Sequence, residues 1–264
     1  MNNAAPIQLT VDKVDYSYRS KKRATLTIFR QLSLTVGEGE FVSLIGPSGC
    51  GKSTMLRLIM GLQLPVSGTI RVAGTVVNGP STKIGMVFQQ DALLPWRTAL
   101  KNVCLGLERD LPRDEAVRRA HAALEQVGLA KFADAYPHQL SGGMRQRVNL
   151  ARALALSPEV VLMDEPFAAL DMLTRERMQE HLINVWERDR KTVVFVTHQL
   201  EEAVFLSDRV ILLGPAPAGV LADVTVNLPR PRTAETKKSV HYHRQVDELA
   251  GLLAKAEARG PLNA

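Results

Sequence analysis

The amino-acid sequence predicts an α/β fold, with one large domain followed by a C-terminal extension. Short apolar stretches at residues 41–45, 159–163 and 192–197 are typical of buried strands. Residues with strong chemistry come directly after all three, at the strand ends where α/β folds place ligands. With 264 residues, 45% of them hydrophobic, the chain is long enough to bury a full core.

A glycine-rich loop connects the first of these strands to a helix. Residues 46–53 have the spacing G-x-x-x-x-G-K-S, and residues 54–60 continue as a helix that Gly61 ends. The glycines let backbone N–H groups point at phosphate oxygens, and the helix adds its positive N-terminal end. The Lys52 ammonium suits β- and γ-phosphates, and the Ser53 hydroxyl can ligate Mg²⁺. The motif predicts a nucleoside triphosphate site made of Gly46, Pro47, Ser48, Gly49, Cys50, Gly51, Lys52, Ser53 and Thr54.

Cys50, inside this loop, is one of only two cysteines; the other is Cys104. Two cysteines are too few for a disulfide framework, which favours a reducing cytosol. A thiol at a helix N-terminus beside Lys52 is expected to have a lowered pKa and to react readily. We therefore expect maleimide to label Cys50 and to inhibit nucleotide hydrolysis, and we expect MgATP to slow this labelling by covering the loop.

The charge balance limits the classes of partner. The net charge is +6, and residues 230–264 carry half of it, with seven Lys/Arg against four Asp/Glu. This tail could favour an anionic surface such as a membrane face. The sequence has no basic stripe with interleaved aromatic residues, so we expect no nucleic-acid partner. Residues 1–6 are polar and no apolar run approaches the roughly 18 residues that span a bilayer, so a membrane role should work through a partner.

Two further strands are expected before the loop, over residues 7–18 and 25–36, with Lys21-Lys22-Arg23 as a solvated tip between them. Tyr16 and Tyr18 lie near the end of the first strand, and one of them could stack on a purine. For Tyr16 we favour ordinary packing within the strand.

Ionisable side chains follow the two later strands. The strand at residues 159–163 runs into Asp164 and Glu165, and the strand at residues 192–197 runs into His198. One carboxylate can hold Mg²⁺ while the other polarises a water. A lone histidine is usually structural, but one at the same sheet edge as two acids is a better functional candidate.

Two regions are open to more than one interpretation. Ser141 stands at the N-cap of a predicted helix, and the glycines at 142 and 143 weaken its start unless a phosphate approaches there. The segment at residues 92–98, after Gln89, is apolar, broken by proline and contains Trp96. Such a loop is usually packed inside its own chain, although it also has the composition of a docking surface.

The pattern changes after residue 214. Residues 229–232 read Pro-Arg-Pro-Arg and are interpreted as a stiff basic linker. Residues 239–258 are expected to form a helix, with Val246, Leu249, Leu252 and Leu253 as its apolar face.

Together these motifs resemble the nucleotide-binding subunit of an ATP-binding cassette (ABC) transporter, over roughly residues 7–232. The run LSGGMRQ at residues 140–146 is similar to the cassette signature. This signature is specific to far fewer protein families than the glycine-rich loop, which many NTPases share. The resemblance implies a P-loop NTPase (RecA-like) core with an antiparallel β subdomain and an inserted α-helical signature subdomain at about residues 90–158. The ABC domain would cover residues 7–228, and residues 229–264 would form the basic linker and a C-terminal helical extension.

A finer resemblance is to the nitrate/sulfonate/taurine importer branch. It rests on the runs LLPWRT at residues 93–98, LDMLTR at residues 170–175 and LPRPR at residues 228–232. One departure is Gln199 after His198, where the family usually has Asp.

The resemblance also implies roles for particular residues. Two copies would enclose two ATP molecules, each between the loop of one copy and the signature of the other. Glu165 would act as the general base, His198 would contact the γ-phosphate, and Tyr18 would stack on adenine. The implied catalytic residues are Glu165, His198 and Gln89; the metal ligands are Ser53, Gln89 and Asp164; and the nucleotide contacts outside the loop are Tyr18, Ser141, Gly142, Gly143 and Asp171.

The implied cofactors are ATP and Mg²⁺, and the implied partners are a second copy and integral-membrane permease subunits that dock near Leu94, Pro95 and Trp96. An extracytoplasmic substrate-binding protein would take part indirectly, and this chain would lie at the cytoplasmic face of the inner membrane. The cargo would be a small oxyanion such as nitrate, a sulfonate or taurine.

Three alternatives remain open at this point. An export-type or lipid-handling ABC ATPase would have the same hydrolytic residues, and only residues 93–97 and the tail argue for import. A cassette protein that acts on ribosomes or DNA typically carries two cassettes or a coiled coil, which this chain lacks. A different P-loop enzyme, such as a small-molecule kinase, would not explain the signature.

Overall fold

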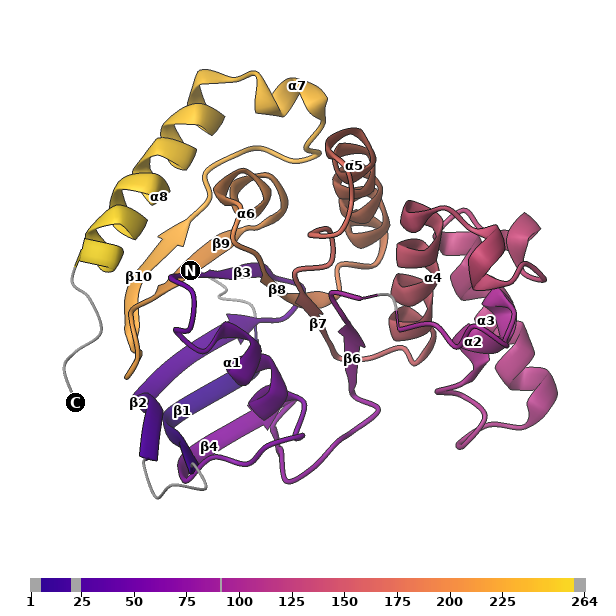
Figure 1. Ribbon diagram of the computed structural model, residues 1–264, viewed down its shortest axis with the longest axis horizontal. Coiled ribbons are helices and arrows are strands. Elements are labelled where there is room, and N and C mark those ends of the chain that lie inside the picture. The colour runs from indigo at the N-terminus through magenta and orange to yellow at the C-terminus, as the bar shows by residue number, and fades with distance from the viewer. Residues whose placement is uncertain (1–5, 20–24, 91, 259–264) are drawn as a thin grey trace. The chain divides into compact units, whose positions relative to one another are not determined.

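The computed structural model describes residues 6–19, 25–90 and 92–258. The chain divides into two compact units, one made of Met1–Ser81 with Arg190–Ala264 and the other of Thr82–Asp189 (Figure 1). Among the described residues, no helix has both the length and the apolar character needed to cross a membrane.

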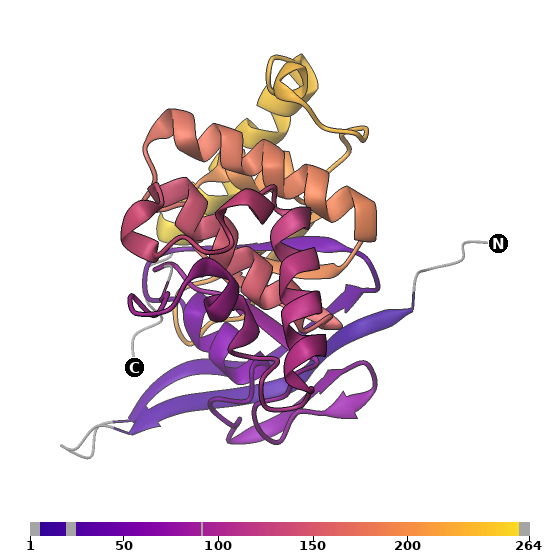
Figure 2. The same ribbon diagram turned by 90° about the vertical axis from the view of Figure 1, so that its right-hand side faces the viewer.

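The first unit contains an antiparallel sheet with the strand order β2-β1-β4-β5. Its members are β1 (Ile7–Arg19), β2 (Thr25–Gly37), β4 (Ser67–Val72) and β5 (Thr75–Val76). The two long strands β1 and β2 pair side by side (Figure 2). Tyr16 is buried in the sheet, which confirms that it packs within the strand. The predicted tip at Lys21-Lys22-Arg23 lies outside the described residues.

The same unit also contains parallel strands that support the glycine-rich loop. Strand β3 (Phe41–Ile45) lies between β8 (Thr192–Val196) and β9 (Arg209–Leu213) and is parallel to both, while β10 (Val220–Thr225) pairs antiparallel with β9. Every residue of β3 and β8 is buried, as their apolar sequences predict. Helix α1 (Lys52–Ile59) follows β3, and helix α6 (Leu200–Leu206) follows β8.

The C-terminal segment packs onto this unit. It forms α7 (Ala234–Lys237) and α8 (Val240–Ala258), and α8 lies against α6 (Figure 1). The buried residues of α8 are Tyr242, Leu249 and Ala256, spaced seven apart. Of the predicted apolar face, Leu249 is buried, whereas Val246, Leu252 and Leu253 are half-buried, because the contact with α6 follows the row through Tyr242.

The second unit combines a short parallel strand pair with helices. Strand β6 (Ile84–Val87) pairs with β7 (Val160–Asp164). The helices are α2 (Ala99–Cys104), α3 (Arg113–Gln126), α4 (Gly142–Ala155) and α5 (Met172–Asp189), with short turns η1 (Ala130–Phe132) and η2 (Pro137–Gln139). Helices α2, α3 and α4 pack against one another, in agreement with the predicted helical subdomain.

Candidate functional site

The glycine-rich loop is packed on one side and open on the other. Gly51 has φ 102°, and a Cβ there would lie 2.5 Å from Ile28 Cγ2 and 2.7 Å from Phe29 Cζ. Gly49 has φ 80°, and a Cβ there would meet nothing within 4 Å. Glycine is required at Gly51 by both conformation and space. The open side at Gly49 leaves the backbone accessible to a ligand.

Lys52 folds back over the loop. Its ammonium Nζ donates hydrogen bonds to the carbonyl oxygens of Gly46 (2.8 Å) and Pro47 (3.1 Å). These bonds keep the positive charge at the loop, beside the first turn of α1, where the helix dipole is also positive. The combination of an ammonium group and a helix N-terminus suits a polyphosphate.

Cys50 does not have the predicted reactivity. Its side chain is 1% exposed, and burial raises the pKa of the thiol even though Lys52 Nζ lies 3.9 Å from Sγ. The prediction of a lowered pKa is therefore wrong, because burial of the side chain disfavours the charged thiolate more than the nearby Lys52 favours it. The backbone N–H of Cys50 belongs to the loop and donates to Pro47 O at 3.3 Å.

We expect maleimide at neutral pH to leave both cysteines of the native protein unlabelled, with or without MgATP, because a buried neutral thiol is a poor nucleophile. Cys104 is also buried, and burial raises its pKa too. Intact-mass spectrometry should show no adduct on the native chain and adducts on both cysteines after unfolding in guanidinium chloride. Rapid labelling of native Cys50 would contradict this account.

Tyr18 and His198 belong to the same unit as the loop. The Tyr18 hydroxyl is hydrogen-bonded to Thr54 Oγ1 (3.3 Å) and donates to Gln63 Oε1 (3.2 Å), so the ring is held beside α1. Strands β3 and β8 pair in parallel with Leu44 opposite Val196. The loop and the exposed His198 therefore leave neighbouring strands at the same sheet edge.

In the second unit, strand pairing brings Gln89 and the two acids to one edge. Val87 lies opposite Met163 in the parallel pair β6–β7, and Gln89, Asp164 and Glu165 follow at the strand ends. Glu165 has φ 44°, in the left-handed region, which costs a residue other than glycine about 1–3 kcal/mol. Six other described non-glycine residues, among them Lys13 and Gln31, have a similar φ, so this conformation does not by itself mark Glu165 as functional.

Helix α4 holds the chain on both sides of Gln89. The Phe88 carbonyl accepts hydrogen bonds from Asn149 Nδ2 (3.2 Å) and Gln146 Nε2 (3.5 Å), and Arg152 Nη1 donates to Ala92 O (2.9 Å). These three side chains are spaced three residues apart on one face of the helix. That spacing is a signal in the sequence that the three side chains share one face of the helix, but it does not identify the Gln89 segment as their partner.

The predicted signature residues form the start of α4. The exposed Ser141 caps the helix, and its hydroxyl accepts a hydrogen bond from Met144 N at 3.3 Å. A Cβ on Gly143 would lie 3.0 Å from Thr174 Cγ2, so this glycine also serves the packing of α4 on α5. Gly142 has more room, with its nearest neighbour, in Leu170, at 3.6 Å.

Charged groups surround this helix start. A cavity of about 330 Å³ next to Ser141 is lined by Arg147, Arg177 and His181, among others. Burial, together with Arg147 and Arg188, lowers the pKa of His181, so this ring is neutral at physiological pH. Asp171 is exposed and accepts a hydrogen bond from Thr174 N at 3.0 Å, which lowers the pKa of its carboxyl and caps α5. The sequence interpretation did not include this cavity.

One buried side chain, Asn102, holds the backbone of the segment around Trp96 by hydrogen bonds. Asn102 is fully buried: its Nδ2 donates to the carbonyls of Leu94, Arg97 and Thr98 at 2.9–3.2 Å, and its Oδ1 accepts from Leu94 N at 2.7 Å. Trp96 itself is 71% exposed. The general expectation that such a loop packs inside its own chain therefore fails for this ring.

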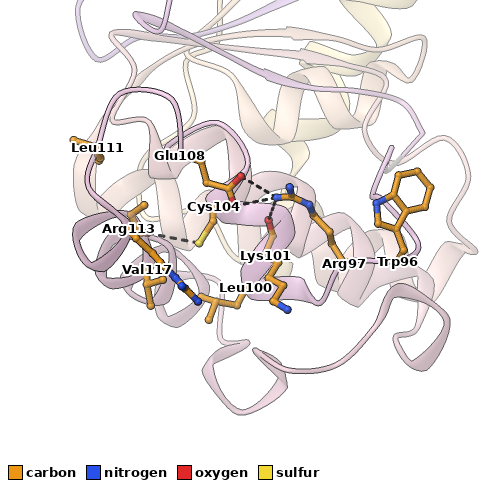
Figure 3. Close-up of a pocket in the computed structure, with 10 residues that line it drawn as sticks. Trp96, Arg97, Leu100, Lys101, Cys104, Glu108, Leu111, Arg113 and Val117 are labelled. Carbon is orange, nitrogen blue, oxygen red and sulfur yellow. Dashed lines mark hydrogen bonds and ion pairs between the residues drawn. The ribbon is translucent and has the colours of Figure 1, made fainter.

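A surface pocket of about 700 Å³ adjoins Trp96 (Figure 3). Its lining includes Trp96, Leu100 and Val117, and the Arg97–Glu108 ion pair (3.0 Å) lies within it. In Figure 3 the pocket runs from Trp96 at one end to Leu111 at the other. Apolar walls with a polar pair between them form a surface that suits an amphipathic segment of a partner.

Comparisons with known proteins agree with the motifs. The family model described as "ABC transporter" matches residues 29–168. The chain belongs to this family. It is 44% identical to the nitrate import ATP-binding protein NrtD of Synechocystis sp. over 243 residues, which are 89% of this chain and 91% of the relative. It is 43% identical to the taurine import ATP-binding protein TauB of Rhizobium johnstonii over 257 residues, which are 94% of this chain and 97% of the relative.

A solved structure is similar as well. The ATP-binding cassette MJ0796, a dimer bound to ADP and Pi in a post-hydrolysis state, matches with a TM-score of 0.71 and 37% identity, covering 83% of this chain and 99% of that one. The chain is therefore an ATP-binding and ATP-hydrolysing subunit of an ABC transporter, with the P-loop NTPase fold. This confirms the predicted family, fold class and enzymatic activity.

Proposed function

We propose that this chain supplies the energy for a membrane importer of a small oxyanion such as nitrate, a sulfonate or taurine. The observation that carries the proposal is the near full-length similarity to two import ATP-binding proteins, one named for nitrate and one for taurine. The residues singled out in this chain serve nucleotide chemistry. Recognition of the proposed cargo is therefore assigned to the permease and the binding protein.

In the proposed mechanism, residues 46–54 bind the phosphates of ATP and Lys52 neutralises part of their charge. Ser141, Gly142 and Gly143 of a second copy approach the same nucleotide with a helix N-terminus. Asp171 of that copy supports this contact, because it follows Leu170, whose side chain lies beside Gly142. The solved dimer of a related cassette supports the two-copy arrangement. Tyr18, held beside α1, stacks on the adenine.

Glu165 is proposed as the general base that accepts the proton of the attacking water. His198 contacts the γ-phosphate, and Gln89 orients the water and contributes to the metal shell. The place of Glu165 directly after the buried strand β7 supports this role, because α/β folds place ligands at the carboxyl ends of such strands.

Oxygen ligands suited to Mg²⁺ are present in the proposed set. Ser53, Gln89 and Asp164 offer a hydroxyl, an amide oxygen and a carboxylate, and Mg²⁺ prefers such donors. Within the described ranges, no group of three or more His, Cys, Asp or Glu side chains could hold a metal by itself. A few protein oxygens together with substrate phosphates are the usual way to hold Mg²⁺, which neutralises phosphate charge when bound.

The proposed partners are a second copy, integral-membrane permease subunits and, indirectly, an extracytoplasmic substrate-binding protein. The exposed Trp96 with the adjoining Leu94 and Pro95 is the proposed docking site for the permease. Leu93 is 9% exposed and is therefore excluded from the contact surface. This arrangement would place the chain at the cytoplasmic face of the inner membrane.

The test is ATP hydrolysis in the assembled transporter. The chain is purified with its permease in liposomes, and a binding protein is added empty or loaded with nitrate, taurine or an alkanesulfonate. We expect a loaded binding protein to stimulate hydrolysis several-fold over the empty one. Stimulation by lipid or by an exported compound, without any binding protein, would favour an export-type or lipid-handling transporter instead.

A further inference from the structure

Helix α6 follows His198 almost directly and is too short to stand alone. It spans Leu200–Leu206, and isolated helices need about 12–15 residues to be even marginally stable in water. Its position therefore depends on the contacts that other segments make with it. Any group that holds α6 also limits where the preceding His198 can lie.

The C-terminal end of α6 is held by two arginines of the Pro-Arg-Pro-Arg segment. Arg232 is 2% exposed, and its Nη1 donates to the carbonyls of Val204 (3.0 Å), Phe205 (3.1 Å) and Ser207 (2.6 Å). Arg230 Nη2 donates to Leu206 O at 2.9 Å. These carbonyls are those left without partners at a helix end, and cations are favourable there.

The interpretation of residues 229–232 as a basic linker therefore needs correction. The arginines are not solvated spacers, because their guanidinium groups replace the missing hydrogen bonds of α6. The ion pair of Arg230 with Asp208 (2.8 Å) adds to this contact.

The same helix end is bonded to the strand that precedes the glycine-rich loop. Asp208 Oδ2 accepts a hydrogen bond from Phe41 N at 3.0 Å. The Ser207 hydroxyl is hydrogen-bonded to the buried Ser43 hydroxyl. One end of α6 is thus fixed relative to β3 as well as to the C-terminal segment.

The other end of α6 is held by α8. The Tyr242 side chain is buried, and its hydroxyl donates to Glu201 O at 3.1 Å. On either side of His198, Thr197 Oγ1 donates to Glu202 Oε2 at 2.6 Å and accepts from Gln199 N at 3.0 Å. The turn that contains His198 is therefore closed by hydrogen bonds, and Tyr242 holds the helix turn into which it leads.

We infer that the segment from Arg230 to Tyr242 positions His198, by holding α6 at its C-terminal end through Arg230 and Arg232 and at its N-terminal end through Tyr242. These are positioning residues, since they act on the histidine only through α6. The inference rests on the proposed contact between His198 and the γ-phosphate.

The test combines a conservative variant with removal of the histidine. In the full-length chain, Tyr242→Phe should lower kcat for ATP hydrolysis about three- to tenfold, the effect expected of one lost hydrogen bond, while KM for ATP changes less than about twofold. In a His198→Ala background the same change should have almost no further effect, since the group it positions is gone. Arg232→Lys keeps the positive charge but loses the several N–H donors of the guanidinium group. It should also lower kcat in the wild-type background and have almost no further effect in the His198→Ala background.

Arg244→Ala is the matched control, because Arg244 is exposed on the same helix, and it should leave kcat unchanged. Equal loss of kcat on Tyr242→Phe in both backgrounds would overturn the positioning role and leave the role of His198 intact. Unchanged kcat in Tyr242→Phe would overturn it too. Full activity of His198→Ala would instead remove the proposed role of the histidine, and the inference with it.

Discussion

Glu165→Gln is expected to lower ATP turnover about 100-fold or more while ATP binding remains. A positioned general base contributes about 10²–10⁴-fold to rate, and an amide cannot accept the proton of the attacking water. The backbone at this position has φ 44°, and Gln has the same backbone preference as Glu, so the substitution adds no strain. The variant should therefore fold normally and bind nucleotide.

A second result should accompany the loss of turnover. If hydrolysis is what opens the proposed two-copy arrangement, MgATP should convert Glu165→Gln into a lasting dimer, measured by light scattering after gel filtration. Glu176→Gln is the matched control, because Glu176 is exposed on α5, and it should turn over ATP normally and stay monomeric. Near-normal turnover of Glu165→Gln would remove Glu165 from the role of base.

The sequence predicted best those elements whose pattern is local and strong. Strand β3 has the predicted bounds, because an apolar run between Glu40 and Gly46 can be recognised from the local sequence alone. Helices α2 and α6 and strand β10 were not predicted. They have six or seven residues each, too few for a helical or alternating period to be recognised.

Properties that depend on distant contacts were predicted less well. The neighbours of Cys50 in sequence predicted a reactive thiol, but its pKa depends on burial by the folded chain around it. Arg232 was interpreted as part of a stiff basic linker, because the α6 carbonyls that it binds lie more than 20 residues earlier in the chain. Gly143 was interpreted as a place for phosphate, and its contact with Thr174 shows a second, structural demand on the same residue.

Several candidate site residues could be predicted because they directly follow buried strands. The sequence predicted that the two acids and His198 follow the ends of buried strands, whereas Gln89 was selected only through the family resemblance. In the structure, parallel pairing brings Gln89 to one edge with Asp164 and Glu165, and the glycine-rich loop to one edge with His198. The supporting side chains Asn102 and Asn149 could not be predicted, since a polar residue in a helix gives no sign of which loop it will bind.

Trp96→Ala is expected to abolish uptake while the isolated subunit keeps its stability and its basal ATPase activity. The ring is 71% exposed, and the backbone beneath it is held by Asn102 rather than by the ring. Surface substitutions of this kind usually change stability by no more than about 0.5 kcal/mol. Loss of an aromatic anchor from an interface often costs more than about 2 kcal/mol of binding, enough to weaken assembly with the permease more than tenfold.

The two tryptophans of the chain provide a direct contrast. Trp186 is 4% exposed, so Trp186→Ala should lower the melting temperature strongly, with a loss of about 3–5 kcal/mol. Met172→Ala removes another exposed apolar side chain, 70% exposed and outside the Trp96 segment, and should affect neither stability nor assembly. Thermal melts, basal ATPase assays and co-purification from membranes should be run on all three variants. A Trp96→Ala subunit that melts far below wild type, or that still co-purifies fully with the permease, would show that Trp96 is not the docking anchor.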